Sequence, residues 1–333
     1  MTRTQKAIVL GATGHAGQAM LRELLGNGYR VTAATRQPTC AALTDLGVCI
    51  ATGDANTPGQ LDAWIAGHDL VVDAAAPSPL SVFSGGDGDP LAIARRRTQS
   101  LLDAVARYGA RLAFVSSFTT LPRPRGERST FESDWRRRIV PYFRVKQLME
   151  DMVLHAARDG LPAVVVNPTA FLGPWEIGAG RSSFVRMVMQ RELPATMHHV
   201  INVVDVRDVA AVICAAVVAR RYGVRVPIAG HNIAVDALAK RIATIAGVTA
   251  PLLSTDSRAT AAAAYWIDAA MALTGRATPD AFRVAPLIAD AWPMEHSAEQ
   301  RALGVPIRPL DETLRDAVRW HATSASAGAC RPP

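Results

Sequence analysis

A glycine-rich turn near the N-terminus constrains the fold of this chain more than any other feature. The segment from Gly11 to Gly17 follows the apolar run Ala7 to Leu10 and opens a helical pattern. In such a turn the first glycine permits a tight bend, the second lets the backbone approach a pyrophosphate, and the third allows the helix to pack on the strand. The helix N-terminus adds N–H donors and a positive dipole. The turn therefore predicts a dinucleotide site, with contacts from Gly11, Thr13, Gly14, His15, Ala16 and Gly17.

Short apolar runs alternate with helical stretches through the first half of the chain. This alternation is typical of βαβ units, and it predicts an α/β fold with a doubly wound parallel sheet of the Rossmann type. Helices are expected to begin near Gly14, Pro58, Pro90 and Pro141, with a further helix from Arg207 to Arg220. The expected strands are Ala7–Leu10, Arg30–Ala34, Cys49–Ala51, Leu70–Ala74, Arg111–Val115, Ala163–Val166, Ile201–Val204 and Gly223–Ile228.

Beyond about Phe171 the pattern changes to isolated helices, loops and aromatic residues, with an alanine-rich helix expected around Ala259 to Ala272. We expect a dinucleotide-binding domain over residues 1–170, to which residues 200–230 return. Residues 171–199 and 231–321 are expected to form a smaller substrate-binding lobe, and residues 322–333 a flexible tail. Candidates for the lining of a substrate pocket are His198, His199, Tyr265, Trp266 and Trp292.

The composition excludes several classes of protein. The four cysteines lie far apart without the spacing of metal ligands, so we expect reduced thiols, no metal site and a cytoplasmic location. The longest apolar run, Val209 to Ala219, is roughly half of what a membrane-spanning helix requires. The formal charge of +7 includes the clusters Arg95–Arg97 and Arg136–Arg138, which lack interleaved aromatic residues. These clusters are expected to be solvated helix faces or phosphate neighbours, which argues against a nucleic-acid track.

The end of the second strand indicates which dinucleotide is preferred. An acidic residue there would hold the ribose hydroxyls of NAD, whereas a cation would bind the additional phosphate of NADP. The sequence has Arg36 at this place and no acidic residue before Asp45. Because a guanidinium pairs with phosphate through two hydrogen bonds, NADP(H) is favoured and NAD(H) is the alternative.

A tyrosine and a lysine, Tyr142 and Lys146, are spaced four residues apart in a predicted helix. This spacing places the two side chains on the same face of the helix. A phenol is a weak acid at neutral pH, and a neighbouring ammonium would stabilise the phenolate and lower its pKa toward the working range. The pair therefore predicts general acid/base chemistry at Tyr142.

Several further motifs complete a pattern along nearly the whole chain. Asp54 follows a glycine after the third strand, and Asp73 to Ala76 follow the fourth. The other motifs are Val115-Ser116-Ser117, Pro141 to Glu150, Asn167 to Pro174, Val204 to Ala210 and Leu303 to Pro306. With the glycine turn, these residues resemble the extended short-chain dehydrogenase/reductase family, also called the NAD-dependent epimerase/dehydratase superfamily, and especially its dihydroflavonol reductase and hydroxysteroid dehydrogenase-like branch.

The resemblance implies a role for each matching residue. Tyr142 would be the general acid/base, Lys146 would lower its pKa and hold the nicotinamide ribose, and Ser117 would hydrogen-bond the substrate oxygen. Further cofactor contacts would come from Asp54 near the adenine, from Ala74, Ala75 and Ala76 near the adenosine and pyrophosphate, and from Pro168 beside the nicotinamide. Family members are frequently homodimers through helices that flank the sheet, so a homodimer is also expected.

The sequence departs from the family pattern at two places. Val145 stands where serine is frequent, and Ala94 stands where many members have asparagine. Phe118 and Thr119 follow Ser117 where sugar-nucleotide dehydratases carry an acidic residue, which argues against a dehydratase. The favoured activity is reduction of a ketone or aldehyde of a small apolar or aromatic substrate.

Two alternatives stay open at this point. The first is a nucleotide-sugar epimerase, for which Arg181, Arg186 and Arg207 could bind a second diphosphate. The second is a non-catalytic NADP-sensing or nucleic-acid-associated protein, which would explain the basic charge. Such proteins usually lack the Tyr/Lys pair that this chain retains.

Overall fold

The structure is a computed structural model. It describes residues 3–36, 41–75, 89–123, 141–177, 183–193 and 195–256, then 260, 263–264, 266–267, 270–271, 285 and 287–324. Within this part of the chain, no helix is long and apolar enough to cross a membrane.

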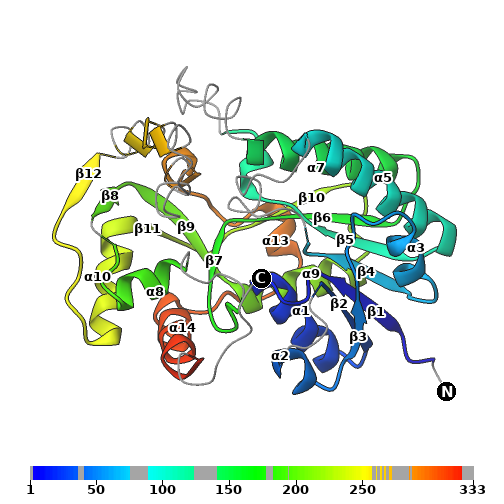
Figure 1. The fold of residues 1–333 in the computed structure, drawn as a ribbon, viewed down its shortest axis with the longest axis horizontal. Helices are drawn as coiled ribbons and strands as arrows, with labels where there is room; N and C mark the ends of the chain where they lie inside the picture. The colour runs from blue at the N-terminus through cyan, green and yellow to red at the C-terminus, as the bar shows by residue number, and fades with distance from the viewer. Residues whose placement is uncertain are drawn as a thin grey trace.

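A seven-stranded parallel sheet forms the centre of the larger part of the molecule, in the order β10-β6-β5-β4-β1-β2-β3 (Figure 1). The chain leaves β1 for β2 on one side and later returns to β4 on the other, so the topological switch point lies between β1 and β4. The predicted doubly wound sheet is confirmed. Its strands are β1 (Lys6–Leu10), β2 (Arg30–Thr35), β3 (Cys49–Thr52), β4 (Leu70–Asp73), β5 (Arg111–Val115), β6 (Ala163–Pro168) and β10 (Arg225–Ile228).

Helices cover both faces of this sheet (Figure 1). Alternate side chains of a strand point to opposite faces, so Val9 packs in one apolar cluster and Ile8 in the other. On the Val9 face lie α1 (His15–Gly26) and α9 (Val206–Val218). The other face carries α3 (Gln60–Ile65), α5 (Pro90–Tyr108) and α7 (Pro141–Arg158). A short helix, α2 (Ala41–Thr44), precedes β3.

The ends of the helices follow from local side-chain chemistry. Asp89 caps α5 by accepting a hydrogen bond from the Leu91 backbone N–H, and Pro90 occupies the first helical position. At α9 the capping residue is Asp205, which accepts from the Arg207 backbone N–H. Asp208, in the first turn of α9, is buried and forms an ion pair with Arg308.

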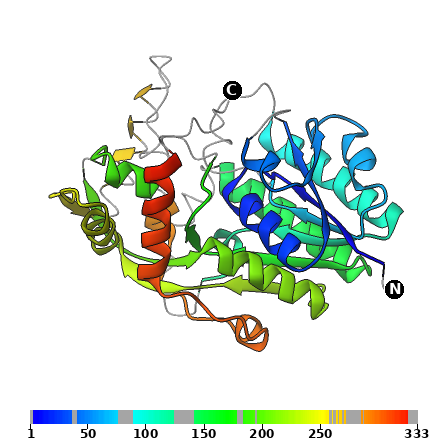
Figure 2. The same ribbon diagram turned by 90° about the horizontal axis from the view of Figure 1, so that it is seen from below.

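The smaller lobe lies beside the large sheet and the helices that cover it, as Figure 2 shows from below. It holds two small sheets, ordered β11-β9-β7 and β12-β8. Their strands, except β9, are only three or four residues long and pair with distant segments, so no local pattern predicted them. The strands are β7 (Ala170–Leu172), β8 (Thr196–His198), β9 (Val200–Asp205), β11 (His231–Ala234) and β12 (Ser254–Asp256). The helices are α8 (Phe184–Met189), α10 (Val235–Ala246) and α14 (Leu310–Ser324), whereas α13 (Ala298–Ala302) packs beside β10 of the large sheet.

The structure bears on the expected flexible tail, the expected alanine-rich helix and the segment 200–230. Residues 322–324, expected to begin a flexible tail, are helical because α14 continues to Ser324, and the rest of that tail lies outside the described residues. Most of the alanine-rich helix expected around Ala259 to Ala272 also lies outside them. Residues 200–230 were expected to return to the dinucleotide-binding domain. Within this segment β10 joins the large sheet, whereas β9 pairs with β7 and β11 of the lobe.

Candidate active site

The glycine turn joins β1 to α1 beside the end of β4. Gly11 has a φ of 76°, which favours glycine, and a Cβ at Gly11 would lie 2.8 Å from the backbone of Ala74 and Ala75. A Cβ at Gly17 would lie 2.1 Å from the carbonyl oxygen of Gly11. These two glycines are therefore required by the close approach of the turn, the helix and the neighbouring strand.

The N-terminus of α1 keeps its backbone donors available. Its capping residue, Gly14, offers no side-chain hydrogen bond, and the first turn holds no acidic residue. In contrast, α5 and α9 are capped by Asp89 and Asp205. Uncapped N–H groups at a helix N-terminus bind phosphate oxygens. Together with its place at the switch point, this turn fits the pyrophosphate of a dinucleotide.

His15 turns its ring away from the turn and toward the lobe. Its Nε2 lies 2.9 Å from the Pro174 carbonyl oxygen, and its ring packs on Phe171. Burial lowers the pKa of His15, with Glu176 opposing this shift. The imidazole is therefore neutral and hydrogen-bonded to Pro174, so the backbone N–H of His15 is the group left for a phosphate.

The other expected cofactor residues lie at the same edge of the sheet. Arg36 is exposed directly beyond β2, and Asp54 is half-buried beyond β3, where its carboxylate accepts from the backbone N–H of Asn56. Pro168 is the buried last residue of β6. Ala74 and Ala75 follow β4, and Ala76 lies outside the described residues.

The structure brings Ser117, Tyr142 and Lys146 together at the end of β5. Their exposed fractions are 7%, 6% and 5%. The hydroxyls of Ser117 and Thr119 lie close enough to the Tyr142 phenol to affect its pKa, and Lys146 Nζ donates to the carbonyl oxygen of Val115 at 3.2 Å. The sequence pointed to Thr119 only as a residue that stands in place of a dehydratase's acidic residue, and not as a neighbour of the phenol.

The electrostatics differ from the sequence-based expectation at Tyr142. Burial raises the pKa of the phenol, and the hydroxyls of Ser117 and Thr119 only partly oppose this shift. Lys146 Nζ lies 6.0 Å from the centroid of the Tyr142 ring. Burial lowers the pKa of Lys146 to about 8, with Asp73 and Glu150 opposing. The prediction that the lysine lowers the phenol's pKa is therefore wrong here, because desolvation of the phenol is the larger effect.

A buried ion pair adjoins this centre. Arg97 donates two hydrogen bonds to the Asp73 carboxylate, at 2.7 and 2.9 Å, and both side chains are almost fully buried. The arginine run was expected to be a solvated helix face or a phosphate neighbour, whereas Arg97 lies on the buried face of α5 with Ala94 and Leu101 and pairs with a carboxylate. Its guanidinium holds the carboxylate at the end of β4, beside the glycine turn.

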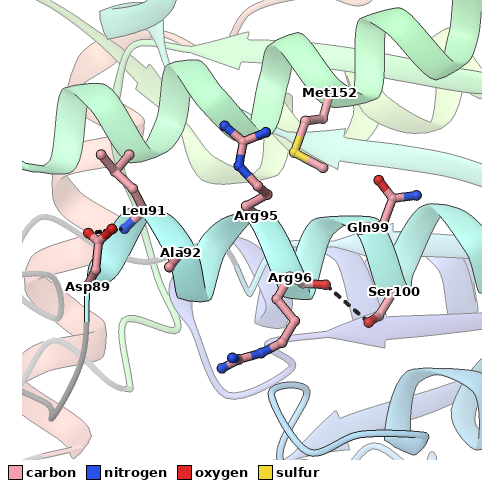
Figure 3. A pocket seen from close by; sticks show the side chains of 8 residues that line it. All are labelled: Asp89, Leu91, Ala92, Arg95, Arg96, Gln99, Ser100 and Met152. Carbon is pink, nitrogen blue, oxygen red and sulfur yellow. Dashed lines mark hydrogen bonds between the residues drawn. The ribbon is translucent and has the colours of Figure 1, made fainter.

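The other two arginines of that run are exposed and line a pocket of about 630 Å³ between α5 and α7. Figure 3 shows Arg95 turned toward Met152 of α7 and Arg96 turned away from it. This pocket contains none of the residues expected to bind the dinucleotide or to transfer protons. The run Arg136–Arg138 lies outside the described residues.

Among the expected pocket residues that the structure describes, Trp292 contacts the residue that follows Ser117. Trp292 is buried, meets Phe118 edge to face at 5.6 Å between centroids, and lies under the Arg123 guanidinium. Arg123 in turn pairs with the buried Asp290 at 2.5 Å. Elsewhere, His198 and Trp266 are exposed, His199 bonds to the Ala291 carbonyl oxygen, and Tyr265 lies outside the described residues.

The arginines considered for a second diphosphate site do not form one in the described residues. Arg207 is engaged by Asp205 and Asp316, each at 2.7 Å. Arg186 bonds along its own helix to Gln190. Arg181 lies outside the described residues. The part of the chain that the structure describes also contains no group of three or more His, Cys, Asp or Glu side chains arranged to hold a metal ion.

Comparisons with known proteins find similar sequences along most of the chain. The sequence model of the NAD dependent epimerase/dehydratase family matches residues 7–227. A protein of Synechocystis sp. named "Putative dihydroflavonol 4-reductase" is 27% identical over 325 residues, which cover 94% of this chain and 93% of that protein. Sterol demethylase protein B of Methylococcus capsulatus is 29% identical over 266 residues, which cover 75% of this chain and 77% of that protein.

Solved structures share the fold. A nucleoside-diphosphate-sugar epimerase from Pseudomonas aeruginosa superposes with a TM-score of 0.73 at 22% identity, covering 97% of this chain and 99% of that chain. At this identity the likeness concerns the fold alone, which is the α/β architecture with a smaller C-terminal sheet region.

Proposed function

The chain belongs to the NAD dependent epimerase/dehydratase family, and on that premise we propose that it is an NADP(H)-dependent oxidoreductase that reduces a ketone or aldehyde to an alcohol. The family uses a nicotinamide dinucleotide, and the turn after β1 fits one. The observation that supports the proposal is the meeting of Ser117, Tyr142 and Lys146 at the end of β5.

The three side chains have separate tasks in the proposed reaction. The bound nicotinamide would supply a hydride to the carbonyl carbon. Tyr142 donates its phenol proton to the carbonyl oxygen, which the Ser117 hydroxyl also holds. The phenol is protonated at neutral pH and so carries the proton that it would donate, although burial raises its pKa and makes it a weaker acid than a free phenol. Lys146, with a pKa of about 8, holds the nicotinamide ribose and lies in the same buried site as the phenol.

The preference for NADP(H) rests on Arg36. This cation is exposed at the end of β2, where the ribose of a dinucleotide lies in this fold, and no acidic residue follows it before Asp45. Asp54 lies beyond β3, and its carboxylate bonds to Asn56 within its own turn. Arg36 is therefore the residue placed to pair with the additional phosphate.

The substrate class is a small apolar or aromatic carbonyl compound. Beside Ser117 the structure places Phe118, which packs on Trp292, so an apolar side chain follows the polar group that would bind the substrate oxygen. The names of two relatives refer to a dihydroflavonol and to a sterol, which are ring systems of this kind. An epimerase would need a second diphosphate site, and Arg207 is committed to two carboxylates.

A panel assay tests the proposal. The purified protein is incubated with ketones, aldehydes or sugar nucleotides together with NADPH or NADH, and the absorbance of the reduced nicotinamide is followed. Net consumption of NADPH with an apolar ketone or aldehyde is the expected result. Conversion of a sugar nucleotide without net consumption would replace the proposal with the epimerase. Binding of NADPH without conversion of any substrate would favour the non-catalytic reading.

A homodimer through the helices that flank the sheet is part of the same proposal. Light scattering at several protein concentrations measures the mass, for which twice 35.5 kDa is expected. The mass of one chain at all concentrations would contradict it.

A further inference from the structure

Three residues of α7, each four positions after the last, face the end of β5. They are Tyr142, Lys146 and Glu150, and they contact three consecutive residues of the opposite segment. Lys146 donates to the Val115 carbonyl oxygen, Glu150 accepts from the Ser116 hydroxyl, and Tyr142 lies near the Ser117 hydroxyl, which affects its pKa. Glu150 thus extends the face that carries the two expected proton-transfer residues by one turn.

Glu150 is a fully buried carboxylate with an unusually complete set of partners. One oxygen, Oε2, accepts from the Ser116 hydroxyl, from Thr120 Oγ1 at 2.6 Å and from Asn167 Nδ2 at 2.6 Å. The other, Oε1, accepts from Arg225 Nε of β10. A buried carboxylate is costly unless it is paired and hydrogen-bonded, and here both oxygens are satisfied.

Two of these partners connect the carboxylate to the backbone of Ser117. The Ser117 carbonyl oxygen lies 2.7 Å from Thr120 Oγ1 and 3.2 Å from Asn167 Nδ2. The Thr120 hydroxyl has one proton, so it bonds either Ser117 or Glu150, whereas the Asn167 amide has two and bridges them. Among the described residues, Asn167 Oδ1 has no partner, so Nδ2 makes every hydrogen bond of this side chain.

We propose that Glu150 is a positioning residue: through Thr120 and Asn167 it fixes the backbone of Ser117, and so places the Ser117 hydroxyl against the Tyr142 phenol. This inference rests on the proposed function, because it assigns Ser117 and Tyr142 their roles. It gives Glu150 a task beyond pairing with Arg225. An ion pair alone would need only Oε1, whereas the links to Ser117 depend on Oε2.

The same carboxylate also acts on Lys146 through space. Glu150 and Asp73 raise the pKa of Lys146 against the effect of burial, and Arg97 lowers it further. Removal of the charge at Glu150 therefore lowers the pKa of this lysine. A limb of the pH–rate profile that reports Lys146 would move to more acidic pH. This movement reports the charge of Glu150 near Lys146, whereas the positioning of Ser117 is reported by a loss of kcat at unchanged KM.

The substitution Glu150→Gln tests the proposal, since it keeps the shape of the side chain and removes its charge. A glutamine can no longer accept from both Arg225 and Asn167 without also presenting its own N–H groups, so the Asn167 amide loses its fixed orientation. We expect kcat to fall on the order of 10²-fold, because small displacements of a reacting group have such effects. KM and NADPH affinity stay unchanged, and the pH limb moves as described.

Two further variants make the result decisive. Asp151→Asn removes a carboxylate from the next position of α7, which is exposed and 3.8 Å from Arg225, and should leave kcat unchanged. Thr120→Val removes one link to Ser117 and keeps the buried charge, so kcat should fall about tenfold without movement of the pH limb. If Glu150→Gln does not fold, as seen by circular dichroism, Thr120→Val carries the test alone.

The outcomes separate this inference from the proposed function. If the wild-type protein converts no carbonyl compound, the proposed function fails, and the inference fails with it. If the wild-type protein is active and both Glu150→Gln and Thr120→Val keep full kcat, only the positioning role is refuted. Equal losses in Glu150→Gln and Asp151→Asn would refute it as well, because the effect would then come from charge alone.

Discussion

Lys146→Met should make the folded protein more stable at neutral pH while removing an expected active-site group. Lys146 has an exposed fraction of 5%, and burial lowers its pKa from the ordinary value of 10.5 to about 8. At pH values below about 8 the Lys146 ammonium is charged in the folded and in the unfolded protein, and the folded protein carries the full cost of burying that charge. The difference between the two pKa values corresponds to about 3 kcal/mol. Methionine has a similar length and carries no such cost.

The sign of the pH dependence follows from proton binding. Between pH values of about 8 and 10.5 the unfolded chain binds more protons than the folded one at this residue, so wild-type stability rises with pH. The cost of the buried charge falls from about 3 kcal/mol near neutral pH to about 1.5 kcal/mol near pH 9.5. Loss of the bond to Val115 offsets about 1 kcal/mol of the gain at both pH values.

Urea unfolding, followed by circular dichroism at these two pH values, measures the effect. We expect Lys146→Met to be more stable than the wild type by about 2 kcal/mol at neutral pH, and by much less near pH 9.5. Lys240→Met, on the exposed side of α10, should show neither effect. An equal difference between Lys146→Met and the wild type at both pH values would refute the assigned pKa, and a less stable variant at neutral pH would refute the cost of burial.

Two further predictions concern the dinucleotide. Gly17→Ala should greatly weaken NADPH binding in a fluorescence titration, because the added Cβ would lie 2.1 Å from the carbonyl oxygen of Gly11. The control Gly26→Ala should bind NADPH normally, because nothing lies within 4 Å of its added Cβ. Normal NADPH binding by Gly17→Ala would contradict the role of the turn. Arg36→Asp should shift the ratio of kcat/KM values toward NADH, and Arg30→Asp, at the other end of the same strand, should not. An unchanged ratio would remove Arg36 from the site.

The parts of the fold that sequence patterns predicted are those with local signals. Strands of the large sheet carry apolar runs with turns on both sides, and their ends agree with the structure to within two residues. The short strands of the lobe gave no such signal. For example, β8 has three residues and pairs with β12, more than fifty positions later, so its conformation depends on tertiary contacts.

At the site, spacing predicted which residues meet but not their electrostatics. Tyr142 and Lys146 share a helix face as expected, yet the direction of the Tyr142 pKa depends on burial, which spacing does not give. The burial of Arg97 and Glu150 could have been predicted from their spacing along their helices, but it was missed. Each lies at helical spacing from buried neighbours, Arg97 with Ala94 and Glu150 with Lys146, and this spacing places a charge inside the molecule.

The central claim is that the Tyr142 phenol transfers the proton that accompanies hydride transfer. Tyr142→Phe removes a single oxygen atom and keeps the ring that packs on Phe143. With an active carbonyl substrate and NADPH, the account predicts that turnover falls by at least about 10²-fold while NADPH affinity stays unchanged. Turnover by the phenylalanine variant at the wild-type rate would contradict the account.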